Sequence, residues 1–264
     1  MLKIIDIHKT FNPGTINEKR ALQGLDLHIK PGEFVTVIGG NGAGKSTLMN
    51  SVSGAYTVDE GQIIIDGVDV THLPEYKRAK FIGRVFQDPM MGTAATMQIE
   101  ENMALALRRG KVRGLRPGIT KKERAMFKEK LATLGLGLED RMTAKVGLLS
   151  GGQRQALTLL MAALQEPKLL LLDEHTAALD PKTAAKVLEA TQQIVEAHNL
   201  TTLMITHNMR DAINYGNRLI MMCDGRIVVD VSGEEKKNLT VPQLLELFSK
   251  ASGTEEVNDK LLLS

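Results

Sequence analysis

Nine consecutive residues near the start of the chain, Gly39 to Thr47 with the sequence GGNGAGKST, have the types and spacing that phosphate binding requires. They satisfy the pattern G-x-x-x-x-G-K-[ST] with Gly39, Gly44, Lys45 and Ser46, and the intervening and following positions are Asn41, Gly42, Ala43 and Thr47. Glycines let backbone N–H groups approach phosphate oxygens without a Cβ in the way, and the first N–H groups of a following helix face the same anion. Lys45 adds a positive charge for the terminal phosphates, and Ser46 offers a hydroxyl to Mg²⁺. The loop therefore predicts binding of a nucleoside triphosphate, and the alternative is a glycine-rich turn that carries Gly-Lys-Ser by chance.

Two adjacent acids follow a second apolar run, LLLL at residues 169–172. Ligands of open α/β sheets lie beyond the carboxyl ends of strands, so Asp173 is placed to hold Mg²⁺, directly or through water. Glu174 is close enough to orient or deprotonate an attacking water. His207 ends the next apolar run and should reach the same sheet edge. The alternatives are an acidic first turn of a helix and a structural histidine.

The segment LSGGQ at residues 149–153 matches a capping box, with Ser150 followed three positions later by Gln153. A serine N-cap followed by Gly151 and Gly152 also exposes N–H groups at the positive end of a helix, which makes a second anion site. An ordinary capped helix explains the same residues, and physical chemistry alone does not separate the two interpretations.

The elements that must position these residues follow from hydrophobic periodicity. Alternating or β-branched runs predict strands at 2–8, 22–29 and 33–38, and a helix follows the glycine loop. Asp-Gly pairs at 66–67 and 224–225 predict hairpins and an antiparallel portion. The helical pattern at 184–198 lies between the apolar runs 168–174 and 201–207, which is typical of a strand, crossover helix, parallel strand unit. Residues 98–165 are mainly helical in pattern and predict an inserted subdomain.

The composition limits the classes of protein. With 264 residues, 43% of them hydrophobic, and a net charge of +2, the chain can build a sizeable core and is not a dedicated nucleic-acid binder. One cysteine, Cys223, excludes an internal disulfide, and no apolar run approaches the roughly 18 residues of a spanning helix. Segment 108–124 carries eight basic residues and one acid, which suits either a solvated surface or contact with lipid headgroups or a partner.

Five segments in order, GGNGAGKST, FQD, LSGGQ, LLLLDE and TH, resemble the ATPase subunits of ATP-binding cassette (ABC) transporters over about residues 2–230. The resemblance implies an α/β fold of the P-loop NTPase class, with a RecA-like core, an antiparallel β subdomain and an α-helical subdomain inserted at about 90–165. It implies one ATPase domain at 1–250, followed by a C-terminal tail at 251–264.

The same resemblance implies an ATP-dependent head-to-tail homodimer, in which each ATP lies between one glycine loop and the other chain's signature segment, Ser150 to Gln153. The resemblance assigns the catalytic base to Glu174, contact with the γ-phosphate to His207, and a position across the interface to Asp180. Gln87 links Mg²⁺ and water to the membrane partner. Phe11 is the aromatic residue expected to stack on adenine.

Several positions depart from the family pattern, namely Ala156, Met161, His175, Ala177 and Asn208. Because histidine titrates near neutrality, His175 suggests a pH-sensitive turnover. Met90, Met91, Met97 and Met103 follow Gln87 and suit either a core or a groove that receives helices of the permease.

The resemblance implies an ATP-hydrolysing subunit at the cytoplasmic face of the cell membrane, which drives solute transport through separate transmembrane permease subunits. Import of amino acids or another small organic solute is expected, together with an extracellular solute-binding protein and with ATP and Mg²⁺ as ligands. The alternative is a non-transport member of the superfamily that acts as a soluble assembly or scaffold factor, for example in iron–sulfur assembly. The chemistry of the partner, apolar and membrane-spanning or soluble, discriminates the two.

Overall fold

The computed structural model describes residues 1–111 and 117–252, and its chain divides into two compact units. The first unit comprises Met1–Arg78 and the chain from Leu200 on, and the second comprises Ala79–Asn199. The centre of the basic segment 108–124 and most of the predicted C-terminal tail lie outside the described residues. Within the described part of the chain, no helix combines the length and apolarity that crossing a membrane would need.

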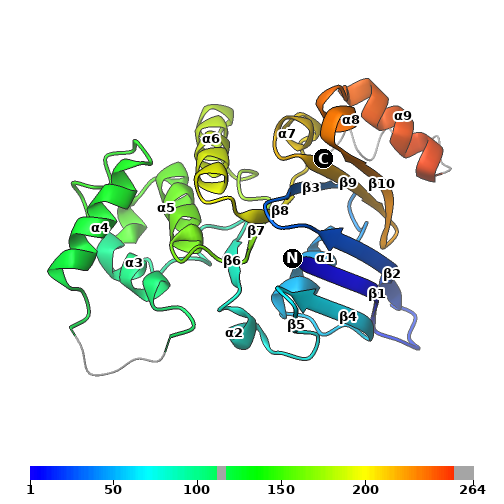
Figure 1. Ribbon diagram of the computed structural model, residues 1–264, viewed down its shortest axis with the longest axis horizontal. Helices are drawn as coiled ribbons and strands as arrows, with labels where there is room; N and C mark the ends of the chain where they lie inside the picture. The colour runs from blue at the N-terminus through cyan, green and yellow to red at the C-terminus, as the bar shows by residue number, and fades with distance from the viewer. Residues whose placement is uncertain (112–116, 253–264) are drawn as a thin grey trace. The chain divides into compact units, whose positions relative to one another are not determined.

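An antiparallel sheet forms one half of the first unit (Figure 1). Its strand order is β2-β1-β4-β5, built from β1 (Leu2–Phe11), β2 (Lys19–Ile29), β4 (Glu60–Ile65) and β5 (Val68–Asp69). Leu2 pairs with Ile29 on one side and Ile65 on the other, and all three side chains are buried. The predicted antiparallel portion and the hairpin at 66–67 are therefore confirmed, and both N-terminal strands are longer than the apolar alternation indicated.

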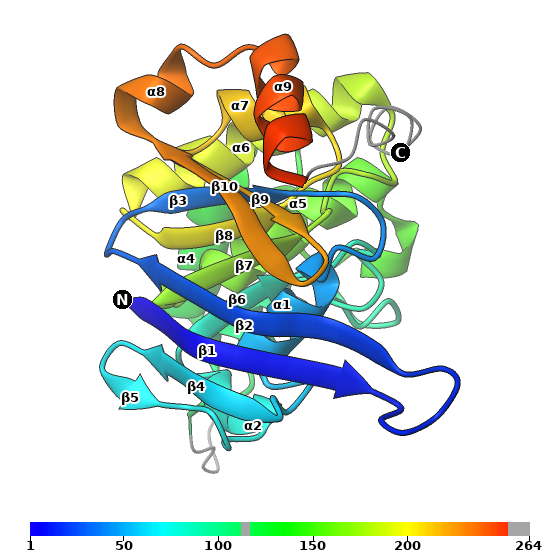
Figure 2. The same ribbon diagram turned by 90° about the vertical axis from the view of Figure 1, so that its right-hand side faces the viewer.

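A second group of strands in the first unit leads to the glycine loop. The strand β3 (Phe34–Ile38) is buried at every position and lies between two parallel neighbours, β8 (Thr201–Ile205) and β9 (Arg218–Cys223). The antiparallel β10 (Arg226–Ser232) pairs with β9 through the predicted turn at 224–225. Figure 2 shows β10 and β9 with α9 (Val241–Ser252) on one side and β1 and β2 on the other. Leu244 and Phe248 of α9 are buried in a core cluster with residues of these strands.

The short helices of this unit connect the strands. They are α1 (Lys45–Ser53), α2 (Glu75–Arg78), α7 (Met209–Asn214) and α8 (Gly233–Lys237).

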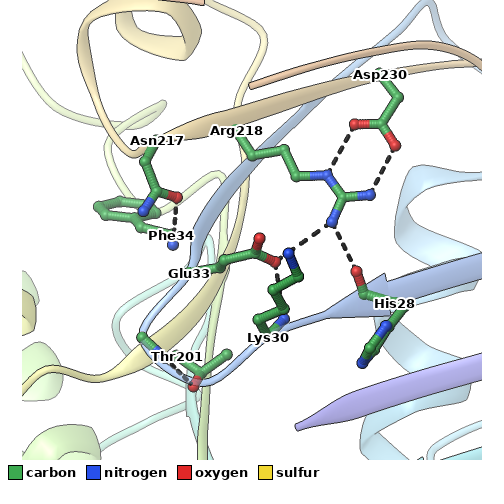
Figure 3. A network of polar contacts seen from close by, with 9 residues as sticks. His28, Lys30, Glu33, Phe34, Thr201, Asn217, Arg218 and Asp230 are labelled. Carbon is green, nitrogen blue, oxygen red and sulfur yellow. Dashed lines mark hydrogen bonds and ion pairs between the residues drawn. The ribbon is translucent and has the colours of Figure 1, made fainter. Parts of the chain in front are cut away.

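A polar network fixes the beginning of β3 (Figure 3). Arg218 at the start of β9 donates to both carboxylate oxygens of Asp230 at 2.8 and 2.7 Å, and to the backbone oxygen of His28 at 2.6 Å. The Asn217 side chain accepts from the backbone N–H of Phe34 at 3.0 Å. Because a bidentate guanidinium–carboxylate pair restricts both partners, the network links β9 to β10 and to β2 next to the start of β3.

The described residues of the second unit form two parallel strands and four α-helices. β6 (Ile82–Val85) pairs with β7 (Leu169–Asp173), and the helices are α3 (Ile99–Leu107), α4 (Lys121–Ala132), α5 (Gly151–Ala163) and α6 (Pro181–Ala197), with a 3-10 turn at Val146–Leu148. Buried apolar residues from α3, α4 and α5 share one core, as Met103, Phe127 and Leu157 illustrate. Of the four methionines considered for a docking groove, Met103 is thus core, whereas Met90 and Met91 are 45% and 70% exposed.

Candidate functional site

The glycine loop lies directly against other backbone segments of the first unit. It runs from Gly39 to Gly44, between the end of β3 and the start of α1. Gly44 has φ +100°, and a Cβ added to it would lie 2.5 Å from the backbone oxygen of Ala21. Gly39 has φ +151°, and a Cβ there would collide with the backbone oxygen of Met222. Only glycine combines these dihedrals with this close approach.

The turn between β9 and β10 holds the loop from one side. The backbone N–H of Gly225 donates to the Ala43 oxygen at 3.0 Å, and the Gly225 oxygen accepts from the N–H of Gln23 at 3.1 Å. The Gln23 side chain donates to the Asp224 oxygen at 2.8 Å. The sequence predicts this hairpin but gives no sign that its turn supports the loop, because the contact joins segments about 180 residues apart.

The start of α1 combines three features of an anion site. Its N-cap is Gly44, which has no side chain to satisfy the first N–H groups of the helix. Ser46 is exposed at this helix start, and Lys45 is 95% buried. The Lys45 ammonium donates to the backbone oxygens of Gly39 and Gly40 at 2.7 and 3.1 Å, so it lies across the loop. Positive charge and the first N–H groups of a helix therefore converge where the sequence predicts phosphates.

Phe11 lies near this loop through its neighbour on β2. Phe11 pairs with Lys19, and the Lys19 ammonium is placed 3.2 Å from where a Cβ on Gly42 would be. The Phe11 ring meets Tyr56 edge to face, with centroids 5.4 Å apart. Sequence reasoning missed both neighbours. The loop between β1 and β2 hides the pairing of Lys19 with Phe11, and Tyr56 is distant from Phe11 in the sequence.

His207 lies at the same edge of the sheet as the glycine loop. Val37 of β3 pairs with Ile205 of β8 in parallel, so Gly39 and His207 both lie two residues beyond paired positions at one sheet edge. His207 is half-buried. Asn208, one of the departures from the family pattern, is the N-cap of α7 and accepts from the N–H groups of Arg210 and Asp211 at 2.9 and 3.2 Å. An asparagine serves this cap as well as an acid would.

The predicted acids and Gln87 converge in the second unit. Val85 of β6 pairs with Leu172 of β7, so Gln87 and Glu174 each lie two residues beyond that pair. Glu174 is half-buried and has φ +45°, an uncommon value for a residue with a Cβ and one that is enriched at functional sites.

Asp173 forms an ion pair with Arg84, at 3.2 Å between Oδ2 and Nη2. The two side chains are only 18% and 12% exposed. Arg84 is a functional candidate that sequence reasoning missed, although a charge within the buried strand segment IGRV was a usable signal.

His175 is not a switch near neutral pH. Its side chain is 98% buried, and this burial lowers its pKa to about 4. Nε2 lies 3.1 Å from Oγ1 of Thr191, whose hydroxyl donates to the Val187 oxygen at 2.8 Å. The hydroxyl therefore accepts from a protonated Nε2, which fixes the neutral tautomer. The expectation that His175 makes turnover pH-sensitive near neutrality is wrong, because burial removes its charge.

The predicted capping box of LSGGQ is present at the start of α5. Ser150 Oγ accepts from the N–H of Gln153 at 3.3 Å, and Gln153 Oε1 accepts from the N–H of Ser150 at 3.2 Å. A Cβ on Gly152 would collide with the Thr183 methyl group, so this glycine also permits close packing of α5 on α6.

Asp180 is the N-cap of α6 and accepts from the N–H of Thr183 at 3.1 Å. Hydrogen bonds from the Thr183 side chain and backbone hold the pKa of Asp180 below its usual value. The structure thus brings Ser150, Gly152 and Asp180 to neighbouring helix starts. The sequence-predicted residues form two groups, one in each unit: Phe11, residues 39–47 and His207 in the first, and Gln87, Ser150 to Gln153, Asp173, Glu174 and Asp180 in the second.

The chain is similar to known proteins of one family. Residues 22–177 match the family described as ABC transporter. The chain is 47% identical over 252 residues to the tyrosine transport ATP-binding protein of Clostridioides difficile, covering 95% of the chain and 100% of that protein. It is 38% identical to a methionine import ATP-binding protein of Rhizobium johnstonii, covering 86% of the chain and 60% of that protein.

Among solved structures, a dimeric ATP-binding cassette bound to ADP and Pi in a post-hydrolysis state matches with a TM-score of 0.73 and 31% identity. The match covers 88% of this chain and 98% of that one. The α/β fold expected from the sequence, that of a P-loop NTPase, is confirmed by this likeness.

Proposed function

Because this chain belongs to the ABC transporter family and hydrolyses ATP to drive transport, we propose that it energises import of an amino acid through separate membrane permease subunits. The observation that carries the choice of solute is the 47% identity to a tyrosine transport protein along that protein's whole length. A methionine import protein is similar over a shorter share of its own length. These relatives are transport proteins, which disfavours the alternative of a soluble assembly factor.

The first unit binds the nucleotide in this proposal. The Lys45 ammonium turns from the Gly39 and Gly40 oxygens to the terminal phosphates, and the uncapped start of α1 faces the same charge. Phe11 stacks on adenine, with Tyr56 fixing its ring by the edge-to-face contact. Lys19, close to Gly42, adds a second ammonium beside the phosphates.

The donors present fit Mg²⁺. Ser46, Gln87 and Asp173 offer hydroxyl, amide and carboxylate oxygens, which this hard cation prefers. Over the residues that the structure describes, no group of three or more His, Cys, Asp or Glu side chains could hold a metal. Proteins bind Mg²⁺ through one or two carboxylates together with substrate phosphates and water, and Asp173 is the carboxylate in this proposal. When bound, it supplies charge neutralisation at the phosphates; Arg84 holds the Asp173 carboxylate in place beforehand.

Glu174 is the proposed general base. Its backbone takes a left-handed conformation immediately after β7, an uncommon conformation that is found more often at functional sites. Gln87 and His207 orient the attacking water and the γ-phosphate, each from the carboxyl end of its own parallel strand.

A second copy of the chain completes each site in this proposal. Ser150, Gly151 and Gly152 begin a capped helix whose positive end suits the γ-phosphate held by the partner subunit's loop. Asp180 lies at the neighbouring helix start and crosses the same interface. The proposed dimer depends on ATP, because the γ-phosphate would bridge one subunit's glycine loop and the other subunit's helix start.

An apolar exposed patch in the second unit suits the permease. Met90, Met91 and Leu148 are 45%, 70% and 71% exposed. Arg154 joins them, because it donates to the Met90 sulfur and to the backbone oxygens of Gly147 and Leu149 on either side of Leu148. Flexible methionines adapt to an apolar helix of a membrane partner. In this proposal the subunit binds the permease at the cytoplasmic face of the membrane, and a solute-binding protein acts on the other side.

Purification from native membranes in mild detergent tests the proposal. We expect apolar, multi-spanning proteins to accompany the chain, and the reconstituted complex to hydrolyse ATP faster with tyrosine than with an unrelated amino acid. Glu174→Gln should abolish turnover while ATP binding persists, whereas Glu189→Gln, an exposed acid of α6, should leave it unchanged. Recovery of only soluble partners would refute the permease, and full activity in Glu174→Gln would refute the general base.

A further inference from the structure

The second unit holds a cavity that neither group of site residues uses. Its volume is about 280 Å³, and it lies between α4, α5 and α6. Its apolar wall includes Leu160, Ala163, Ala190 and Ile194, and two basic side chains, Lys130 and His198, line it as well. Among the described residues, no acidic side chain lines it.

The basic side chains form a polar chain with Glu166. His198 Nδ1 lies 3.0 Å from Glu166 Oε1, and His198 Nε2 lies 3.4 Å from the Lys130 ammonium. Nδ1–H therefore donates to the carboxylate, and Nε2 accepts from Lys130. An ammonium carries three donors, of which this contact uses one. Lys130 is thus a cation held beside an apolar space, with donors left for an anion.

We propose that this cavity binds a small monocarboxylate with an apolar body. The Lys130 ammonium binds the carboxylate, and the aliphatic side chains of α5 and α6 pack against the apolar body. Small-molecule sites usually combine an apolar lining with a few polar groups in this way. At the roughly 30 Å³ that one water occupies in the liquid, the cavity has space for on the order of ten non-hydrogen atoms. A zwitterion fits poorly, because its own ammonium would lie close to Lys130.

The place of the cavity on α5 and α6 gives it a regulatory consequence, which rests on the proposed function. These helices begin at Ser150 and Asp180, at the proposed dimer interface, and pack tightly there through Gly152 and Thr183. Further along, Ala163 of α5 and Ile194 of α6 both line the cavity. A ligand that fills this space stiffens the helix pair and thereby changes the rate of ATP turnover.

A titration of the nucleotide-free full chain tests the site, with 3-phenylpropionate as the probe and methyl NMR as the readout. We expect saturable shifts at Leu160, Ala163 and Ile194. The matched alcohol, 3-phenylpropanol, and phenylalanine should each bind at least about tenfold more weakly, since one hydrogen bond to a charged group is worth that factor. Absence of saturation, or equal affinity for acid and alcohol, would overturn the proposal.

Variants locate the binding. Lys130→Met should weaken the probe by at least about tenfold, whereas Lys122→Met, an exposed lysine of the same helix, should stay within about twofold. Ala190→Leu fills the cavity from a half-buried position and should abolish binding. Wild-type affinity in Lys130→Met or Ala190→Leu would overturn the site.

ATP turnover is then measured with and without the probe. A change that Ala190→Leu removes supports the regulatory consequence, and unchanged turnover despite binding refutes that consequence alone. The titration uses no nucleotide, so it measures binding to the cavity even if the proposed transport function is wrong. Failure of the cavity proposal and failure of the proposed function therefore give different results.

Discussion

Arg78 is expected to be a main determinant of stability in the first unit. It is 99% buried, and its guanidinium donates to four backbone oxygens. Nη1 reaches Ser51 and Val52 at 2.7 and 2.9 Å, Nε reaches Leu73 at 2.8 Å, and Nη2 reaches Thr71 at 2.9 Å. Ser51 and Val52 belong to the last turn of α1, where carbonyls lack intrahelical partners and the helix dipole favours a cation.

The substitution Arg78→Met keeps much of the side-chain volume and removes all four hydrogen bonds. A buried carbonyl left without a partner costs about 1–3 kcal/mol, so the four together cost at least about 4 kcal/mol before relaxation. Burial lowers the pKa of Arg78, which shows that its charge is desolvated, and removing the charge returns part of that cost. We expect a net loss of about 3–5 kcal/mol, which lowers Tm by roughly 6–20 °C for a chain of this size.

Thermal unfolding followed by circular dichroism measures the loss, with urea unfolding as the check on free energy. Arg78→Lys keeps the charge without the planar fork and should fall between wild type and Arg78→Met. Lys77→Met, at the exposed neighbouring position of α2, should change the free energy by no more than about 0.5 kcal/mol. A Tm within about 2 °C of wild type in Arg78→Met would refute the role assigned to the four hydrogen bonds.

Three further substitutions test local arguments. Burial lowers the pKa of folded His175 to about 4, whereas an unfolded histidine titrates near 6.5, so stability is present above about pH 6.5 and is lost as pH falls toward 4. Urea unfolding at successive pH values measures this loss of unfolding free energy. In His175→Gln the loss between pH 6.5 and 4 should be smaller by about 3 kcal/mol, and a pH profile equal to that of wild type would contradict the argument. Gly44→Ala should weaken ATP binding at least about tenfold in a nucleotide titration, because its Cβ meets the β2 backbone; wild-type affinity would refute the clash. Arg84→Met should cost about 2 kcal/mol in nucleotide-free unfolding, since the pair with Asp173 is largely but not wholly buried, and no change would show the pair to be inert.

The sequence predicted the local parts of this structure well. The strand before Gly39, the helix after Gly44 and the capping box of Ser150 and Gln153 are encoded within a few residues, so short patterns contain the whole signal. The hairpin turn at 224–225 was likewise recognisable from its Asp-Gly pair.

Long-range contacts could not be predicted in the same way. Nothing near Gly225 shows that its N–H supports Ala43, and nothing near Arg78 shows that it caps α1. His175 is an example. Its residue type suggested titration near neutrality, but burial and the contact with Thr191, sixteen positions along the chain, keep it neutral. A side chain's pKa depends on its packed surroundings, which a single sequence does not display.

Four helix starts near the predicted site residues differ in what satisfies their first N–H groups. Gly44 at α1 provides no side-chain cap, whereas Ser150, Asp180 and Asn208 each accept from an N–H of their own helix. The uncapped helix start therefore suits direct anion binding through its N–H groups. A capped helix start needs a further hydrogen-bond donor to bind an anion. At α5 that is the hydroxyl proton, because Ser150 Oγ accepts from Gln153 and can still donate to a phosphate.

Ser150→Asp separates the two interpretations of this helix start. Aspartate is as good an N-cap as serine, so thermal stability should stay within about 0.5 kcal/mol of wild type. The new negative charge faces the γ-phosphate that the partner subunit would hold, and it lacks a proton to donate, so we expect ATP turnover to fall at least about hundredfold while nucleotide binding to the monomer persists. Ser150→Ala is the matched variant, which loses both the cap, at about 1 kcal/mol, and the donor. If Ser150→Asp hydrolyses ATP like wild type, the segment is only a capped helix, and the second anion site proposed at α5 is wrong.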